Sequence, residues 1–233
     1  AGGALPFSFV SVPVTLPMTV VVERLNEIRP PLLYGYPAML SQLGAEQRAG
    51  RLRIAPGMVI CTSETLTPEL RGSIRAAFGV PVIDTFGSTE GLIGASPPDD
   101  EVLTFAEDGC IVELVDADDR PVPPGTPSAA VLITSLENRL QPLIRYRLTD
   151  SFVQQPPVEG HGYLRARVQG RSDEVLRFGD VALHPMVVRS VLGHAAEVLD
   201  YRVRQLPRGI AVSVLAPGGA DAQQLRAHLA AAL

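Results

Sequence analysis

The stretch that decides the fold is Asp84-Thr85-Phe86-Gly87-Ser88-Thr89-Glu90-Gly91, which directly follows the apolar, β-branched segment Val80 to Ile83. A strand that runs into an aromatic residue, a glycine, two hydroxyls and a carboxylate suits a site for a nucleotide phosphate and its metal. The glycine lets the backbone approach a ligand closely. The hydroxyls can donate to phosphate oxygens, and the carboxylate is a hard oxygen ligand for Mg²⁺. Gly-Ser-Thr is also ordinary turn composition, so the functional interpretation depends on partner motifs downstream.

The segments before this stretch alternate between helical and strand-like patterns. We predict helices over residues 18–30, 37–49 and 67–78, and strands over residues 32–36, 58–62 and 80–83. This alternation predicts a parallel α/β sheet, in which ligands bind beyond the carboxyl ends of the strands. Tyr34, the segment Thr62-Ser63-Glu64 and the stretch 84–90 all fall at such ends. The predicted ligand site therefore lies at this edge of the sheet.

The pattern changes near residue 100 and again after Gly170. Strand-like segments at 111–115 and 130–134, separated by a turn-rich stretch, indicate antiparallel β structure, such as a small barrel. The C-terminal part reads as a hairpin around Gly179-Asp180, a helix from Pro185, two strands, and a helix that begins at Asp221. The predicted fold class is α/β, with parallel sheet layers and helices (1–98), a small β-rich subdomain (99–171) and a small α+β C-terminal domain (172–233).

Composition limits the classes of partner. The net charge of −5 provides no basic surface for nucleic acid or anionic membranes. Prolines interrupt the uncharged first 22 residues and no basic segment precedes them, so we expect no signal peptide or membrane span. Two cysteines do not make a disulfide framework, which favours reduced thiols and a cytoplasmic protein. All 20 positive residues are Arg, so no lysine of this chain can be catalytic.

Two further segments complete an ordered set of motifs. They are Pro142-Leu143-Ile144-Arg145-Tyr146-Arg147-Leu148-Thr149-Asp150 and Gly170-Arg171-Ser172-Asp173-Glu174-Val175-Leu176-Arg177-Phe178-Gly179-Asp180-Val181. In order with Phe86 to Glu90, they resemble the adenylate-forming superfamily of acyl-CoA ligases and adenylation domains, in particular its phenylacetate–CoA ligase and coenzyme F390 synthetase branch. The resemblance implies that residues 1–171 are the C-terminal part of the large domain of that family, and that 172–233 belong to its small mobile domain, which is incomplete.

The resemblance assigns the phosphate and metal roles to the opening stretch. Ser88 and Thr89 would bind the α-phosphate of ATP or AMP, with Gly87 allowing the close approach. Glu90 would bind the Mg²⁺ that bridges the phosphates. Thr89 and Glu90 are therefore the expected catalytic residues.

The resemblance also assigns the nucleoside pocket. Phe86 would lie against the adenine ring, where the family usually has Tyr. Asp84 and the turn Ser63-Glu64 would line the adenine pocket. Asp150 would accept hydrogen bonds from both ribose hydroxyls, and Arg171 would contact ribose or phosphate.

Two more roles follow from the resemblance. Asp173 would be the hinge about which the small domain rotates between two half-reactions, and Tyr34 and Tyr36 could line a pocket for an aromatic acid. The small-molecule carboxylic acid would be activated as an acyl-adenylate. It would then pass to a thiol, either coenzyme A or the phosphopantetheine of a carrier protein. Homodimers are common in this branch.

Other interpretations of single residues remain open. Taken alone, Asp150 is also typical of a turn or a helix cap, Arg171 of a solvated surface charge, and Glu64 of a cap on the helix after Thr67. Cys61 is more typical of a small buried apolar residue than of a nucleophile.

The chain departs from the family pattern in three places. No glycine-, serine- and threonine-rich phosphate loop precedes the matched region, the C-terminal lysine of the family is absent, and Thr149 replaces a glycine. A threonine would be unfavourable there if the position needs a positive φ. Two alternatives to an acid–thiol ligase therefore remain: a non-catalytic member that acts as a binding or scaffold module, and a nucleotidyl transferase that adenylylates a cofactor.

Overall fold

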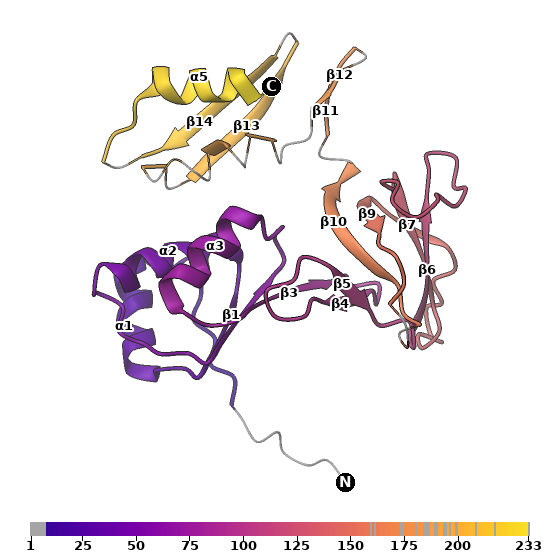
Figure 1. Ribbon diagram of the computed structural model, residues 1–233, viewed down its shortest axis with the longest axis horizontal. Coiled ribbons are helices and arrows are strands. Elements are labelled where there is room, and N and C mark those ends of the chain that lie inside the picture. Colours follow the sequence, from indigo (N-terminus) through magenta and orange to yellow (C-terminus); the bar gives the residue numbers. More distant parts are fainter. Residues whose placement is uncertain are drawn as a thin grey trace.

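The computed structural model describes residues 8–232 apart from 159, 161, 173, 174, 180, 184–186, 189, 190, 193, 194, 196, 199, 208 and 217. The N-terminal elements are α1 (Met18–Ile28), β1 (Leu32–Gly35), α2 (Pro37–Arg48), β2 (Met58–Thr62), α3 (Pro68–Phe78) and β3 (Val82–Gly87). The middle elements are β4 (Ile93–Ala95), β5 (Leu103–Phe105), β6 (Cys110–Val115), β7 (Ala130–Ser135), β8 (Tyr146–Leu148), β9 (Asp150–Gln154) and β10 (Arg165–Arg171). Figure 1 shows their arrangement.

The N-terminal elements form the predicted parallel α/β unit. β1, β2 and β3 pair in parallel, and α2 and α3 are the connections between them. The ends of α3 follow local sequence signals. The Thr67 hydroxyl accepts a hydrogen bond from the Leu70 N–H at 3.3 Å, and Gly79 ends the helix with φ 68°. One buried apolar cluster, which includes Val22, Leu40, Val59, Ile74 and Val82, joins the three helices to the three strands.

The sheet does not end at β3. Seven strands run in the order β1-β2-β3-β4-β5-β10-β9, and every pairing beyond β3 is antiparallel. β3 also starts later than predicted and extends to Gly87, because Thr85, Phe86 and Gly87 pair with β4. The first half of the Asp84–Gly91 stretch is therefore strand, and the second half is the tip of a hairpin.

The β-rich region has its own core, which is continuous with the sheet. β6, β7 and β8 form a three-stranded antiparallel sheet whose side chains pack with those of β5, β9 and β10. Phe105 and Phe152 are almost fully buried in this cluster, and Phe86 packs against it. The prediction of antiparallel β structure is confirmed for residues 110–171. The predicted subdomain boundary at 98/99 stays a prediction, because β4 before it pairs with β5 after it in one sheet.

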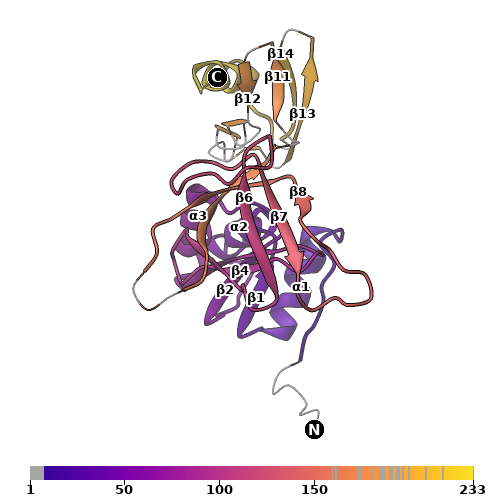
Figure 2. The ribbon, with the colours of Figure 1, turned by 90° about the vertical axis from the view of Figure 1, so that its right-hand side faces the viewer.

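The C-terminal elements form a small α+β unit. They are β11 (Leu176–Phe178), β12 (Val181–Leu183), β13 (Asp200–Leu206), β14 (Gly209–Leu215) and α5 (Ala222–Ala232). The hairpin β11–β12 and the pair β13–β14 agree with the predicted segments, and the Asp221 carboxylate caps α5 by accepting from the N–H groups of Gln223 and Gln224. Figures 1 and 2 both show this unit on one side of the rest of the chain. The proposed hinge Asp173 and Pro185, where a helix is predicted to begin, lie outside the described residues, whereas the described residues 187, 188, 191 and 192 are helical.

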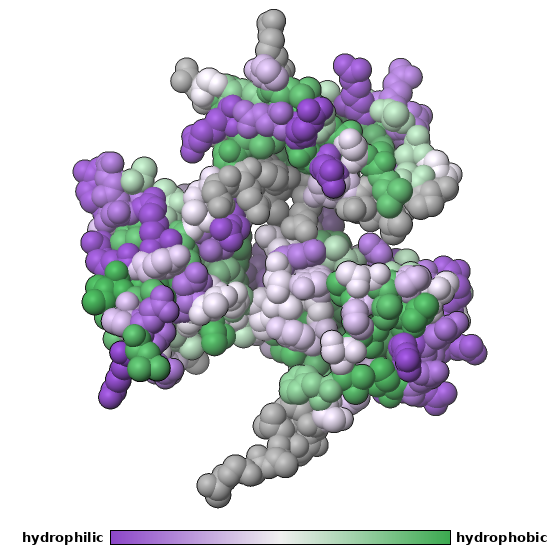
Figure 3. Space-filling model, turned by 180° about the vertical axis from the view of Figure 1, so that it is seen from behind, coloured by the Kyte–Doolittle hydropathy of each residue, from purple (hydrophilic) through white to green (hydrophobic). Residues whose placement is uncertain are grey.

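The surface is mixed in character. Figure 3 shows hydrophilic and hydrophobic residues interleaved on the rear face, which is hollowed between the α/β unit, the β-rich region and the C-terminal unit. Among the described helices, none combines the length and the apolar character needed to span a bilayer.

Candidate functional site

A cavity of about 750 Å³ opens at the carboxyl ends of β2 and β3, where the strand pattern predicts a ligand site. It is lined by Ser63, Glu64, Thr65, Asp84, Thr85, Phe86, Gly87, Ser88, Thr89, Glu90, Tyr146, Arg147, Leu148, Thr149, Asp150, Val168, Gly170 and Arg171. Residues from all three ordered motifs therefore meet at one place. Tyr34 and Tyr36 are not among its lining residues; they are 60% and 39% exposed, so their role in an acid pocket stays a prediction.

The hairpin tip between β3 and β4 presents the hydroxyls. The N–H of Leu92 donates to the Ser88 hydroxyl oxygen at 3.2 Å, and the N–H of Ser88 donates to the Leu92 carbonyl at 2.9 Å. Leu92 is fully buried and anchors the loop, and Gly91 turns it with φ 109°. The Ser88 oxygen accepts from Leu92, so its own O–H remains available to donate to a ligand such as a phosphate oxygen.

Glu90 lies in the same tip with the exposed Thr89 beside it. Within the described part of the chain, no group of three or more His, Cys, Asp or Glu side chains could hold a metal ion. A single carboxylate with neighbouring hydroxyls nevertheless fits Mg²⁺, which is typically held by one or two carboxylates together with substrate phosphates and water. Glu90 could therefore hold Mg²⁺ together with a bound nucleotide.

Phe86 is a cavity wall and part of the core at once. Its ring makes edge-on contacts with Phe152 (centroids 5.2 Å apart) and Phe105 (5.9 Å). Close packing fixes the ring orientation, so a purine could stack on a surface that is already in place. Gly94 keeps this arrangement possible, since a Cβ there would lie 2.8 Å from the Phe105 ring.

Asp84 is a cavity-lining carboxyl group whose pKa lies well above its ordinary value. Burial raises its pKa to about 6, opposed by the positive charge of Arg71 and by a hydrogen bond from the Thr85 backbone. Ser96 fixes both backbone polar groups of Asp84: the Asp84 N–H donates to the Ser96 hydroxyl at 3.0 Å, and the Asp84 carbonyl accepts from the Ser96 N–H at 2.8 Å. Asp84 is therefore a carboxylate on a rigid strand, held ready to accept hydrogen bonds from a ligand.

Arg71 is a residue that the sequence analysis missed. It lies in α3, is only 8% exposed, and donates through Nη1 to the Val82 carbonyl at 2.8 Å. Its Nε and Nη2 are buried without a hydrogen-bond partner in the described structure, although its charge acts on Asp84. The signal was present in the sequence, because Arg71 shares a helical face with Ile74 and Phe78, and an arginine on a buried face needs an anion nearby.

The turn Ser63-Glu64 links the cavity to α2. Ser63 adopts the left-handed conformation with φ 63°, which is uncommon for a residue with a side chain. The Glu64 carboxylate accepts a hydrogen bond from the Ala38 N–H at 3.1 Å, in the first turn of α2. By sequence, Glu64 is also a candidate cap for the helix after Thr67, but the cap of α3 is the Thr67 side chain itself. Glu64 satisfies an N-terminal amide of the neighbouring helix instead.

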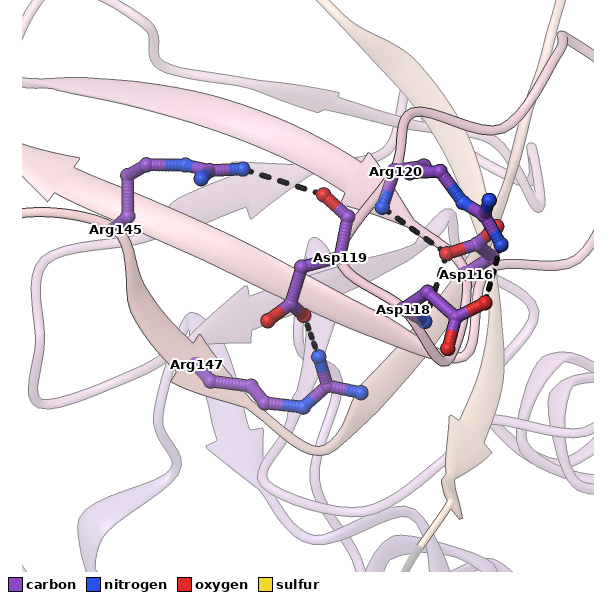
Figure 4. Close-up of polar contacts among 6 residues, drawn as sticks. All are labelled: Asp116, Asp118, Asp119, Arg120, Arg145 and Arg147. Atoms are coloured by element: carbon purple, nitrogen blue, oxygen red, sulfur yellow. Dashed lines mark hydrogen bonds and ion pairs between the residues drawn. The ribbon is translucent and has the colours of Figure 1, made fainter.

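The opposite wall carries Arg147, which belongs to the motif 142–150 but to which the sequence assigns no role. Its guanidinium contacts the Asp119 carboxylate in the turn between β6 and β7 (Figure 4). Arg145 donates to the Asp119 carbonyl at 3.3 Å and to the Glu113 carboxylate at 3.1 Å. The Asp116 carboxylate shapes the same turn by accepting from the N–H groups of residues 118 and 120. These contacts join the cavity wall to an exposed acidic turn.

Asp150 and Arg171 face each other across the β9–β10 ladder as register partners. Thr149 precedes Asp150 and is absent from the non-glycine residues with positive φ, so threonine is not strained at this position. Both residues line the cavity, although Arg171 is exposed, and their contacts with a nucleotide stay a prediction.

Cys61 lies under the cavity and is fully buried. Burial, with smaller contributions from Asp84 and Glu64, raises the pKa of its thiol to about 12. A thiol in this state is a poor nucleophile. Cys61 therefore acts as a buried apolar residue, as the sequence analysis favours.

Comparisons with known proteins agree with this geometry. Residues 7–135, more than half of the chain, match the family described as AMP-binding enzyme. A phenylacetate-coenzyme A ligase from Aromatoleum evansii is 25% identical over 184 residues, covering 73% of this chain and 40% of that protein. A benzoate–CoA ligase from Thauera aromatica is 27% identical over 237 residues, covering 91% of this chain and 44% of that protein.

Solved structures share the fold. A 2-hydroxyisobutyryl-CoA ligase in the postadenylation state matches with a TM-score of 0.74 and 19% identity, over 92% of this chain and 51% of that one. An anthranilate CoA ligase in complex with anthranoyl-AMP matches with a TM-score of 0.67 and 21% identity, over 92% and 45%. This chain thus spans about half the length of the relatives that it matches. The chain belongs to the AMP-binding enzyme family, and its resemblance to the adenylate-forming superfamily, in the phenylacetate–CoA ligase-like branch, is confirmed.

Proposed function

We propose that the protein to which this chain belongs activates a carboxylic acid with ATP as an acyl-adenylate and transfers the acyl group to a thiol. The observation that carries the proposal is the single cavity lined by Ser88 to Glu90, Asp150 and Arg171, which come from three separate motifs. Family membership and the names of the relatives support the same reaction class.

In the first half-reaction, an oxygen of the acid attacks the α-phosphorus of ATP, and pyrophosphate leaves. Ser88 and Thr89 would donate to the α-phosphate oxygens, where negative charge accumulates. Glu90 would bind Mg²⁺, which supplies charge neutralisation between the phosphates when it is bound. The role of each residue is therefore to stabilise charge or to hold the reacting groups in line.

The nucleoside would be held by the remaining walls of the cavity. Phe86 offers a ring face for adenine, Asp84 a hydrogen-bond acceptor, and the turn Ser63-Glu64 the edge of that pocket. Asp150 would accept from the ribose hydroxyls, as an ionised carboxylate can, and Arg171 would donate to ribose or phosphate. Asp173 would be the hinge between the two half-reactions.

The names of the relatives support a proposal for the acid and the acceptor. Phenylacetate, benzoate and anthranilate ligases suggest an aromatic acid, for which Tyr34 and Tyr36 could supply contacts. The acceptor would be coenzyme A or the phosphopantetheine of a carrier protein. We further propose a homodimer and a cytoplasmic protein, the latter because Cys61 and Cys110 are both free and buried.

ATP–pyrophosphate exchange on the full-length protein tests this proposal, with a panel of aromatic and aliphatic acids and a parallel calorimetric titration with ATP and Mg²⁺. We expect exchange with at least one aromatic acid. Replacing Glu90→Gln should raise the Mg²⁺ concentration needed for half-maximal exchange by about tenfold or more. Glu101→Gln, at an exposed position outside the cavity, should leave that concentration unchanged. Absence of exchange with every acid, together with absence of ATP binding, rejects the proposal. An unchanged Mg²⁺ dependence in Glu90→Gln rejects the metal assignment alone.

A further inference from the structure

Thr149, in the single-residue corner between β8 and β9, receives three hydrogen bonds from the end of β10. Arg171 Nη2 donates to the Thr149 hydroxyl oxygen at 2.8 Å. The N–H and the hydroxyl of Ser172 both donate to the Thr149 carbonyl, at 2.7 Å and 3.0 Å. One residue therefore fixes both the guanidinium of Arg171 and the backbone that follows it.

The end of β10 bends just before Arg171. The register between β9 and β10 shifts between Val168 and Gly170, so that β10 contains one more residue than its partner here. Such a bulge bends a strand and redirects the side chains that follow it. The Arg171 side chain is exposed beyond this bend, and a long exposed side chain samples many rotamers unless a contact selects one.

The Thr149 hydroxyl supplies one such contact from the wall of the same cavity. A guanidinium carries five N–H donors in a fixed plane, so a bond from Nη2 to Thr149 is compatible with donation to a ligand oxygen at the same time. A hydroxyl acceptor has no charge of its own. This contact therefore orients the guanidinium without itself opposing the positive charge, unlike the contact of the Asp119 carboxylate with Arg147.

We infer that Thr149 is a positioning residue that holds the Arg171 guanidinium toward the nucleotide cavity. This inference rests on the proposed function, because it assumes that Arg171 contacts ribose or phosphate. It also gives a physical role to the position at which the chain departs from the family pattern. The two bonds to the Thr149 carbonyl do not depend on the side chain at 149, so the hydroxyl can be removed while they remain.

The experiment compares four forms of the full-length protein by calorimetry with AMP and with ATP, and by steady-state kinetics. They are the wild type, Thr149→Val, Arg171→Ala and the double variant. Valine keeps the branched shape and removes the hydroxyl. We expect Thr149→Val to weaken nucleotide binding by about fivefold, as the loss of a partly solvated charge-assisted hydrogen bond implies, and to raise the KM for ATP more than it lowers kcat.

Two further variants separate positioning from folding. Thr149→Ser keeps the hydroxyl and should bind nucleotide within about twofold of the wild type. Thr126→Val, in the exposed turn between β6 and β7, changes the same atoms away from the cavity and should change neither KM nor kcat. In the Arg171→Ala background, Thr149→Val should have no additional effect on nucleotide binding, since the guanidinium that it orients is gone.

The outcomes distinguish this inference from the proposed function. If the wild type binds no nucleotide, the proposed function fails. If the wild type binds but Thr149→Val binds equally well, or weakens binding by the same factor in the presence and absence of Arg171, the inference fails and the function stands. If Arg171→Ala leaves nucleotide binding unchanged, the inference is overturned together with the role assigned to Arg171, while Ser88, Thr89 and Glu90 keep theirs.

Discussion

Replacing Asp84→Asn should stabilise the protein at alkaline pH and have no effect on stability in acid. Burial raises the pKa of Asp84 to about 6 in the folded chain, from an ordinary value of 3.8. The folded state therefore binds this proton more tightly than the unfolded state, and stability falls as the pH rises from 3.8 to about 6. Above pH 6 the full cost of a buried carboxylate is present, and below 3.8 it is absent.

The magnitude follows from the two pKa values. Each pH unit between them corresponds to about 1.36 kcal/mol, so the ionised carboxylate costs at most about 3 kcal/mol of the free energy of unfolding. Part of the group stays in contact with solvent, which reduces the cost. Asparagine has almost the same shape and no charge, so it should recover most of that free energy at pH 8.

Urea denaturation of the wild type and Asp84→Asn at pH 8, 6 and 4 measures the difference. We expect the advantage of the variant to be largest at pH 8, nearly as large at pH 6, and only a small fraction of that at pH 4. Glu101→Gln removes one negative charge at an exposed position and serves as the matched control. A variant that is less stable than the wild type at pH 8, or an advantage that does not change with pH, would refute the reasoning.

Four further perturbations test other parts of the site and core. Arg71→Met removes the positive charge that lowers the pKa of Asp84, so the carboxyl should titrate above pH 6 in ¹³C-detected NMR; an unchanged titration would show that the two groups do not interact. Phe152→Ala deletes a fully buried ring and should lower the free energy of unfolding by about 3–5 kcal/mol in urea titrations, and a loss below about 1 kcal/mol would contradict the packing. Cys61 should resist iodoacetamide at pH 8 in the folded protein and react after unfolding, because burial raises its pKa to about 12; rapid labelling of the native state would contradict this. Glu64→Gln should cost about 1 kcal/mol through the weakened bond to the Ala38 N–H, which thermal unfolding can detect against Glu101→Gln.

The sequence predicts those parts of the structure that local patterns encode. The parallel unit up to Val82 follows from alternating apolar segments and from signals such as Thr67 and Gly79, which act within one turn of their own helix. The cavity position follows because the ends of parallel strands share an edge of the sheet. The ordered motifs at 84–91, 142–150 and 170–181 also predict Asp150 and Arg171 as site residues, and both line the cavity.

The remaining features depend on contacts between segments distant in the chain. The three-residue strands β4 and β5 are too short to show a period of two, and their pairing joins the α/β unit to the β-rich region. The bond from Ala38 to Glu64 and the ion pair of Arg147 with Asp119 each require a neighbour that no local pattern names. Such partners become visible only once the chain is folded.

The Glu64 carboxylate couples the cavity to α2. It lines the cavity and also accepts a hydrogen bond from the Ala38 N–H in the first turn of α2. A ligand that attracts this carboxylate must loosen its hold on the Ala38 amide hydrogen, which would then exchange with deuterated solvent more quickly. The opposite change, slower exchange, would follow if a ligand fixes Glu64 in its present place. The exchange rate of the Ala38 amide therefore reports whether a ligand occupies the cavity. Hydrogen–deuterium exchange mass spectrometry can measure it without a probe inside the cavity.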